Sequence, residues 1–342
     1  MKKIIFLTDN NFFGQTRKPW VSMDTNKIIL MLKENHFDVE SYFFNEVYDK
    51  NIENCYIFYS FSQKEELRNY IVDIIYFLSK KNTVIPSFEL LKCHENKGFQ
   101  ELYKKQLGIN SLDSIYLNSI NNVTNSVFSV VLKTVDGSNG KGVFLVNNEK
   151  EFKKIIQKIE SKITILQKID LLRRKYFRKK KNYPAYPNYN NRTDYYQYKE
   201  YIRNDKRFVL QQFIPNLTFD YRVLALYDKY YVMKRHTKEG DFRASGTKLF
   251  DFNVEKNQEL LTYAKNIFDR INTPMLSMDI AFNGEQYYLI EFQASHFGVS
   301  ALIKSEGYYS LINNKWDLIS APSNLETEIA ESVIKFINSN WS

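Results

Sequence analysis

The chain has 342 residues, of which 44% are hydrophobic, so it is long enough for two domains and excludes a protein that is disordered throughout. Two cysteines, Cys55 and Cys93, exclude a disulfide framework, and we expect a reduced cytoplasmic protein. No apolar run approaches the roughly 20 residues that cross a bilayer, and the apolar start is too short for a signal peptide.

The net charge of +9 is concentrated in one segment. Residues 171–207 hold 12 Lys or Arg and 3 Asp or Glu, which leaves 36 basic and 36 acidic residues elsewhere. The excess charge is therefore a local feature of this segment and not a property of the whole protein.

Residues 1–92 alternate between strand-like and helix-like runs. Short apolar or alternating runs typical of strands occupy 2–9, 37–44, 55–61 and 83–89, and amphipathic helix patterns occupy 23–37 and 65–82. This alternation predicts an α/β domain over 1–92 with a small open parallel sheet.

Residues 93–342 show a different pattern. A helix is expected over 90–110, ending at Gly108, and another over 151–161. Most of the other apolar runs read as strands in hairpin arrangement, with Asn283-Gly284 as a two-residue turn; they occupy 127–135, 142–146, 163–168, 208–214, 221–236 and 277–293. These elements predict an α+β domain with antiparallel sheets.

The basic segment 171–207 interrupts two strand-like runs, so we interpret it as an inserted loop or a partly helical arm. Its Arg and Lys residues are interleaved with many tyrosines. Such a surface can bind an anionic polymer, either nucleic acid, an acidic glycan or a phosphate-rich chain. A solvated lid or an oligomer contact is the alternative.

A glycine-rich loop, DGSNGKG, lies between two strand-like runs at 136–142 and follows Lys133. It is neither a Rossmann fingerprint nor a P-loop, because it connects two strands and lacks both spacings. Glycine lets backbone N–H groups approach phosphate oxygens, so the loop suits a phosphate-covering lid. An ordinary hairpin with a flexible tip is the alternative.

Other stretches follow in a definite order: HENKGFQELYKKQLGI before the loop, and then QQFI, DYRVLALYDKYYVMKRH, GDFRASG and SMDIAFNGEQYYLIEFQASHFG. Together with the loop, they resemble the ATP-grasp superfamily, which includes D-alanine–D-alanine ligase, glutathione synthetase and the ligases that add glutamate to a ribosomal protein. The resemblance covers about residues 90–340, and the α/β domain before it is also typical of the superfamily.

The resemblance implies an ATP- and Mg²⁺- (or Mn²⁺-) dependent ligase. Such an enzyme activates a carboxylate as an acyl phosphate and joins it to an amine, releasing ADP and phosphate. The substrates would be small-molecule, glycan or peptide carboxylates and amines, and a homodimer is possible. The alternatives are a small-molecule kinase on the same fold and a non-enzymatic polyanion-binding protein that uses the basic segment.

The resemblance also implies residue roles at the nucleotide. Two lysines would neutralise the α- and β-phosphates under a lid over 134–142, and the QQFI stretch would read the adenine edge through its backbone. The residues implied are Lys97, Lys133, Gly137, Ser138, Gly140, Lys141, Gln211, Gln212 and Ile214.

Three arginines are the implied catalytic residues: Arg243 first, then Arg235 and Arg222. Their positive charge can stabilise an acyl phosphate and the tetrahedral intermediate that follows amine attack. The alternative is that they are surface arginines paired with Asp220 and Asp241.

The implied metal ligands are Asp279, Glu291 and Gln293, whose oxygens suit Mg²⁺. Gln293 replaces the asparagine that is usual in the family. A strict two-residue turn would set Asp279 opposite Tyr288, so the convergence of these ligands is implied by the resemblance alone. His296 follows closely and is either a substrate contact or a structural residue.

Overall fold

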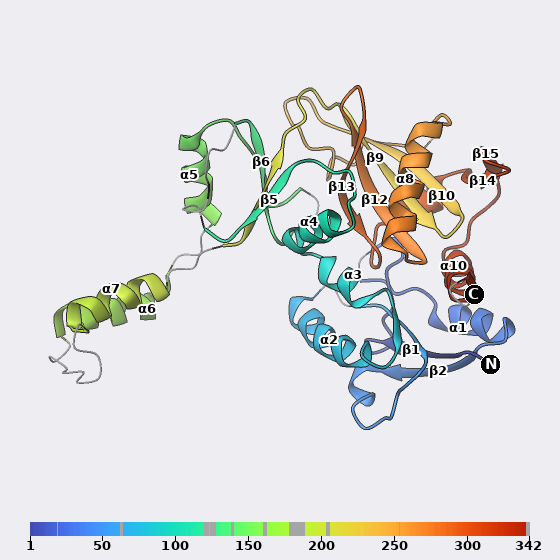
Figure 1. Cartoon of the computed structure of the whole chain (residues 1–342), viewed down its shortest axis with the longest axis horizontal. Helices are drawn as coiled ribbons and strands as arrows, with labels where there is room; N and C mark the ends of the chain where they lie inside the picture. Colours follow the sequence, from blue (N-terminus) through green and yellow to red (C-terminus); the bar gives the residue numbers. More distant parts are fainter. Residues whose placement is uncertain are drawn as a thin grey trace.

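The computed structural model describes residues 1–18, 20–61, 64–119, 123, 128–137, 140–159, 163–177, 189–202, 206–252 and 254–339. Figure 1 shows an N-terminal α/β layer below a large antiparallel sheet, a smaller antiparallel sheet beside it, and a helical arm that projects away from both. The predicted fold class, a parallel α/β unit followed by antiparallel sheets, is confirmed.

The N-terminal sheet is parallel and has the order β2-β1-β3-β4. Its first strand, KIIFLT, is buried at all but its first position, because helices cover both faces of the sheet. The elements are β1 (Lys3–Thr8), α1 (Thr25–Glu34), β2 (Asp38–Phe43), η1 (Phe44–Glu46), β3 (Tyr56–Tyr59), α2 (Glu65–Leu78) and β4 (Thr83–Ile85).

The last helix, α10 (Leu325–Ser339), returns to this N-terminal layer and packs beside α1 (Figure 1). Its buried residues Ile329, Val333 and Ile337 join one core with Ile4 and Phe6 of β1. That core also includes buried residues of the large sheet, so the chain ends tie the two layers together.

The large sheet is antiparallel with the order β13-β12-β9-β10-β14-β15, and β11 pairs with β10. Helix α8 (Gln258–Ile271) covers one face through an apolar stripe that includes Leu260, Ala264 and Ile271. The strands are β9 (Phe219–Leu226), β10 (Lys229–His236), β11 (Phe250–Asp251), β12 (Met275–Phe282), β13 (Tyr287–Gln293), β14 (Gly307–Ile312) and β15 (Lys315–Ser320); a short helix, α9 (Ser300–Lys304), precedes β14.

The expected two-residue turn between β12 and β13 is wrong. Phe282 pairs with Tyr287, so the connection covers residues 283–286, where the Asn283 side chain accepts hydrogen bonds from the next backbone N–H groups. A bulge after Asp279 shifts the register again and sets this residue opposite Glu291 instead of Tyr288.

The smaller sheet has the order β5-β8-β6-β7, formed by β5 (Ser114–Leu117), β6 (Val130–Thr134), β7 (Val143–Val146) and β8 (Phe208–Gln212), all antiparallel. Helix α5 (Glu149–Ile159) packs against it through Phe152 and Ile156.

The helix expected over 90–110 is two helices, α3 (Phe88–Cys93) and α4 (Lys97–Gln106). The break occurs because Glu95 adopts a positive φ of 49° and the Asn96 side chain caps the N-terminus of α4. The predicted end at Gly108 is right, and Lys97 becomes the first residue of the second helix.

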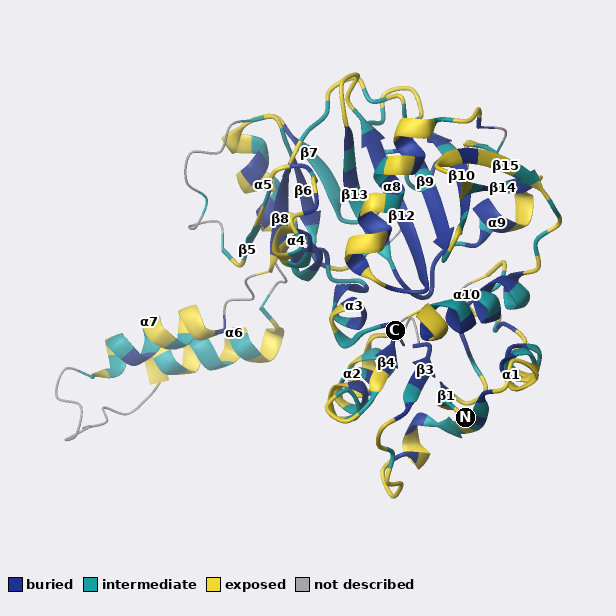
Figure 2. Cartoon of the chain, turned by 45° about the vertical axis from the view of Figure 1, so that its right-hand side comes forward, coloured by how far each residue is buried: buried dark blue, intermediate teal, exposed yellow. Residues whose placement is uncertain are grey.

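The strand expected over 163–168 is a helix. Thr164 and Gln167 form a reciprocal capping box that begins α6 (Ile165–Leu172), and a π-helical turn, Arg173–Phe177, continues it. With α7 (Asn191–Tyr201) these elements form the projecting arm, so the partly helical interpretation of the basic segment is right for its described part (Figure 2). Residues 178–188 and 203–205 of that segment lie outside the described residues.

Candidate functional site

A cavity of about 800 Å³ lies where the small sheet, the large sheet and the glycine-rich loop meet, and the N-terminal layer contributes to its wall. The structure brings most of the expected site residues to this one cavity. Those that line it are Lys97, Lys133, Gly137, Gly140, Gln211, Gln212, Ile214, Arg222, Arg235, Arg243, Asp279, Glu291 and Gln293. Lys141 is exposed and does not line the cavity, and Ser138 lies outside the described residues.

The two lysines reach the cavity from different elements. Lys97 begins α4, and its ammonium donates a hydrogen bond of 2.6 Å to the carbonyl oxygen of Gly137. Lys133 lies on β6, and burial lowers the pKa of its ammonium to about 8, although Glu101 and Glu291 oppose the shift. Each residue is only 6% exposed, so neither lies on a solvated helix or strand face. Both ammonium groups are therefore held at the cavity wall.

The glycine-rich loop requires glycine where it turns back on β6. At Gly142, with φ of 74°, an added Cβ would lie 1.9 Å from the Thr134 hydroxyl. At Gly137, with φ of 110°, it would lie 2.8 Å from the Lys141 carbonyl oxygen. Glu95 accepts a hydrogen bond from the Gly137 N–H, and Lys97 donates to the Gly137 carbonyl oxygen, so these two residues hold both backbone polar groups of Gly137.

The QQFI stretch, residues 211–214, passes the cavity at the end of β8. Gln211 is buried and pairs in register with Val131 on β6, whereas the side chain of Gln212 is exposed. Val131, Leu112 and Ile290 give this end of the cavity an apolar lining. A flat heteroaromatic ring fits between such walls.

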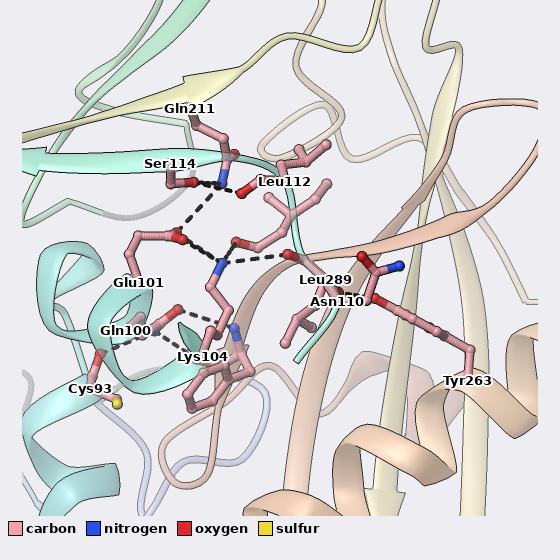
Figure 3. Close-up of polar contacts among 12 residues, drawn as sticks. Cys93, Gln100, Glu101, Lys104, Asn110, Leu112, Ser114, Gln211, Tyr263 and Leu289 are labelled. Atoms are coloured by element: carbon pink, nitrogen blue, oxygen red, sulfur yellow. Dashed lines mark hydrogen bonds and ion pairs between the residues drawn. The ribbon is translucent and has the colours of Figure 1, made fainter. Parts of the chain in front are cut away.

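A buried polar network lies behind Gln211, as Figure 3 shows. The fully buried Lys104 of α4 donates to Glu101 at 2.9 Å, and Glu101 accepts from the amide nitrogen of Gln211 at 3.5 Å. The same amide nitrogen donates to the Ser114 hydroxyl at 3.2 Å. The network therefore connects α4 to the two strands that flank the apolar end of the cavity.

Two arginines and two aspartates form a second network at the opposite side of the cavity. Arg235 donates to both oxygens of Asp220 at 2.6 Å and to Asp279 at 2.8 Å. Arg222 donates to both oxygens of Asp279 at 2.8 and 3.0 Å. Burial raises the pKa of Asp279, but the two guanidinium groups outweigh it and hold the pKa at about 2. Arg235 is thus paired with Asp220, as the alternative expected, but the pair is buried rather than at the surface.

Arg243 lies on the loop after β10 and is partly exposed. Its guanidinium pairs with Asp241, as the alternative expected, and also donates to the Gly140 carbonyl oxygen at 3.1 Å. The side chain therefore reaches across the cavity mouth to the glycine-rich loop.

The residues expected to bind a metal lie on one wall of the cavity. Among the described residues, no three His, Cys, Asp or Glu side chains converge as a metal site. The bulge does bring Asp279 opposite Glu291, and Gln293 adds an amide oxygen to the same wall. Glu291 and Gln293 offer oxygens that suit Mg²⁺, which keeps waters and takes its remaining ligands from phosphate oxygens. Asp279 shares its Oδ2 between Arg222 and Arg235, whereas its Oδ1 accepts one hydrogen bond from Arg222 and keeps a lone pair for the same ion.

Several cavity residues were not predicted from the sequence. Gln15 comes from the N-terminal layer and donates to the Phe297 carbonyl oxygen, and Glu95 lies in the break between α3 and α4. Lys248 follows β10. Glu95 and Lys248 carried a sequence signal, since Glu95 lies within the HENKGFQELYKKQLGI stretch and Lys248 lies close to the GDFRASG stretch, whereas Gln15 carried none.

His296 also lines the cavity, is 5% exposed, and has a φ of 53°. Among the described residues, neither of its ring nitrogens has a hydrogen-bond partner, and burial lowers its pKa to about 4. The ring of the buried His94 lies 6.1 Å away, equally without a partner, but it does not line the cavity.

Among the described residues, no helix combines the length and the apolar character needed to cross a membrane. No family model matches the sequence, and no curated protein matches it either. Solved structures do match, at low sequence identity.

The first is an ATP-grasp RimK domain protein from Sphaerobacter thermophilus, at 10% identity and a TM-score of 0.52, covering 98% of each chain. The second is a D-alanine–D-alanine ligase from Bacillus anthracis complexed with ATP, at 11% identity and a TM-score of 0.50, covering 99% of this chain and 95% of that one. The third is a RiPP-associated ATP-grasp ligase from Chryseobacterium gregarium, complexed with ADP and with a leader and core peptide. It matches at 13% identity and a TM-score of 0.52, covering 100% of this chain and 98% of that one.

These proteins share the layer of parallel strands, the two antiparallel sheets and nearly the full length of this chain. The chain has the ATP-grasp fold.

Proposed function

We propose that the protein is an ATP- and Mg²⁺-dependent ligase that joins a carboxylate to an amine. The observation that carries this proposal is the distribution of charge around one cavity. Lys97 and Lys133 line it on the side of the glycine-rich loop, and Asp279 and Glu291 line it on the large sheet. A triphosphate held between the two sides would meet ammonium groups on one side and a metal-binding wall on the other.

Asp279, Glu291 and Gln293 would hold Mg²⁺, which when bound would act as a Lewis acid on the phosphate oxygens. Other residues of the chain would bind the adenine and shield the phosphates. The apolar end at Gln211, Gln212 and Ile214 would hold the adenine, and the loop would exclude water from the phosphates.

The arginines would stabilise charge that develops at the reacting carboxyl group. Arg222 uses Nε and Nη2 to bind Asp279, and Nη1 lies close to Gly298, where an added Cβ would approach it to 3.2 Å. That nitrogen can donate to an acyl phosphate or to the tetrahedral oxyanion. Arg243 lies beside the loop and would contact the transferred phosphate.

The amine would approach along the wall formed by Gln15, Glu95 and His296. The Gln15 amide nitrogen is used by Phe297, so its oxygen can accept, and Glu95 and a neutral imidazole are further acceptors. Acceptors suit the N–H groups of an amine. Two solved ATP-grasp ligases of the same fold hold peptides, so peptides belong among the substrates to be tested.

The first test is a thermal-shift measurement with ATP and Mg²⁺. Saturating nucleotide should raise the melting temperature by mass action, and Lys133→Ala should remove most of the shift. A screen of carboxylates and amines for ADP release then distinguishes a ligase from a small-molecule kinase. A ligase gives an amide product that depends on the amine, whereas a kinase releases ADP without one. A well-folded sample whose melting temperature ignores Mg²⁺-ATP would contradict the proposal.

The projecting arm favours a second function, the binding of an anionic polymer. Its described part exposes Arg173, Tyr176, Phe177 and Tyr196, and Arg174 stacks on Tyr198 at 3.8 Å. Basic and aromatic side chains on one exposed element can hold a polyanion. Electrophoretic mobility shift with single-stranded RNA and with heparin, at two salt concentrations, tests it.

A further inference from the structure

A buried ion pair requires a physical reason, because removing two charges from water costs more than their attraction usually returns. Lys104 is 0% exposed and Glu101 has a side-chain exposure of only 9%. In the described part of the chain, the Lys104 ammonium has, besides Glu101, only the carbonyl oxygens of Leu289 and Ile290 as hydrogen-bond acceptors, at 3.5 and 3.4 Å. An apolar pair of similar volume would suit this part of the core, so stability alone does not explain the charges.

The charges do have a consequence for Gln211. An ionised carboxylate only accepts hydrogen bonds, so the amide nitrogen of Gln211, and not its oxygen, must face Glu101. Ser114 fits the same orientation, because its hydroxyl donates to the Leu112 carbonyl oxygen and accepts from the Gln211 amide nitrogen. A hydroxyl can rotate to donate instead, so Ser114 does not fix the orientation without Glu101. Both N–H bonds of the amide are therefore directed into the network of Figure 3.

The amide oxygen is left for the cavity. Gln211 lines the apolar end, and among the described residues its oxygen accepts no hydrogen bond. A fixed acceptor at that position selects a ring that carries a donor. Adenine has an exocyclic amino group, whereas guanine has an oxygen at the corresponding position, which would meet the amide oxygen as a second acceptor.

We propose that the Lys104–Glu101 pair is a positioning device that fixes the Gln211 amide and so selects adenine over guanine nucleotides. The Lys104 ammonium holds the Glu101 carboxylate in place at 2.9 Å, and this carboxylate accepts from the Gln211 amide nitrogen and so determines which end of the amide faces the nucleotide. This inference rests on the proposed nucleotide site and adds to it the residues that determine base selectivity.

The test compares three probes by titration calorimetry in Mg²⁺: ATP, GTP and purine riboside triphosphate, which lacks the amino group. The wild-type chain should bind ATP at least about 10-fold more tightly than either analogue, the expected effect of one buried polar mismatch. Glu101→Gln can present either end of its amide to Gln211, so it should lower both ratios by about 10-fold while Mg²⁺-ATP still binds.

The double variant Lys104→Met/Glu101→Leu guards against a folding defect in the single variant. Replacing both charges by apolar groups keeps the core filled and leaves no unpaired charge, so the fold should persist while selectivity is lost. The matched control is Lys229→Met/Glu328→Leu, which removes a partly buried ion pair whose two charged groups lie 2.7 Å apart. Neither residue lines the cavity, so this variant should leave both ratios unchanged.

The outcomes separate the two proposals. If wild-type protein binds none of the three nucleotides, the proposed function fails and the inference fails with it. If wild-type protein binds all three equally, or if folded Glu101 variants keep the wild-type ratios, the inference is overturned and the nucleotide site stands. Loss of selectivity in the two Glu101 variants but not in the control supports the inference.

Discussion

At the scale of single residues, the cavity contains ionisable groups whose environment is unlike water. Lys133 is the clearest case, because burial lowers its pKa from the ordinary 10.5 to about 8. Between these two pH values, the unfolded chain binds a proton at this residue and the folded chain does not. Stability of the ligand-free protein should therefore rise with pH over this interval as far as Lys133 is concerned.

Nucleotide binding should reverse this effect. Phosphate oxygens beside Lys133 favour its charged form, so ATP binding at pH 9 should take up close to one proton, and binding at pH 6.5 should take up none at this residue. Calorimetry in buffers of different ionisation enthalpy measures the uptake. Lys133→Arg keeps a positive charge for nucleotide binding but does not titrate in this range, so it should remove the uptake. Uptake that persists in this variant would assign the proton to another group.

His296 and His94 form a matched pair for testing the amine wall. Both are 5% exposed and lack hydrogen-bond partners among the described residues, but only His296 lines the cavity. Once an amine substrate is found, His296→Phe should raise its KM by about 10-fold with little change in the KM for ATP, the expected effect of one lost hydrogen bond. His94→Phe should leave both values unchanged, and equal effects of the two variants would argue for a structural role.

At the scale of secondary-structure elements, the arm is the least integrated part of the described chain. Its two helices pack on each other, with Arg174 joining Asp170 and Asp194, while Ile165, Leu166 and Ile169 are exposed. Figure 2 shows that the arm projects away from the sheets.

Replacing residues 163–202 by a short flexible linker should therefore leave Mg²⁺-ATP binding within about twofold, since none of the described arm residues lines the cavity. It should abolish any binding of RNA or heparin. Thermal shift with ATP and mobility shift with the polyanion give the two readouts on the same preparation. Loss of ATP binding with an intact fold would show that the arm belongs to the nucleotide site.

At the scale of the whole molecule, the N-terminal layer and the large sheet share one hydrophobic core through α10. We expect the two layers to unfold together. Ile329→Ala should lower the free energy of unfolding by about 2–5 kcal/mol, and one cooperative transition should remain in calorimetry. Lys335→Ala, on the same helix but exposed and paired with Asp228, should cost no more than about 1 kcal/mol. Two separate transitions in the wild-type protein would contradict the shared core.

The sequence by itself determined the order of the layers and most of the candidate site. Alternation of strand and helix patterns and the glycine-rich loop after Lys133 are properties of neighbouring residues, so they can be read directly from the chain. The roles of the other site residues were implied by the resemblance of several ordered stretches to a known superfamily. Tertiary structure decided what depends on distant segments. The approach of Gln15 and Glu95 to the cavity and the contact of the Lys104–Glu101 pair with Gln211 join elements far apart in the chain. The bulge after Asp279 depends on how β12 pairs with β13, which the residue pattern did not reveal. The strand expected at 163–168 became a helix because a capping box and exposure outweighed its β-branched residues.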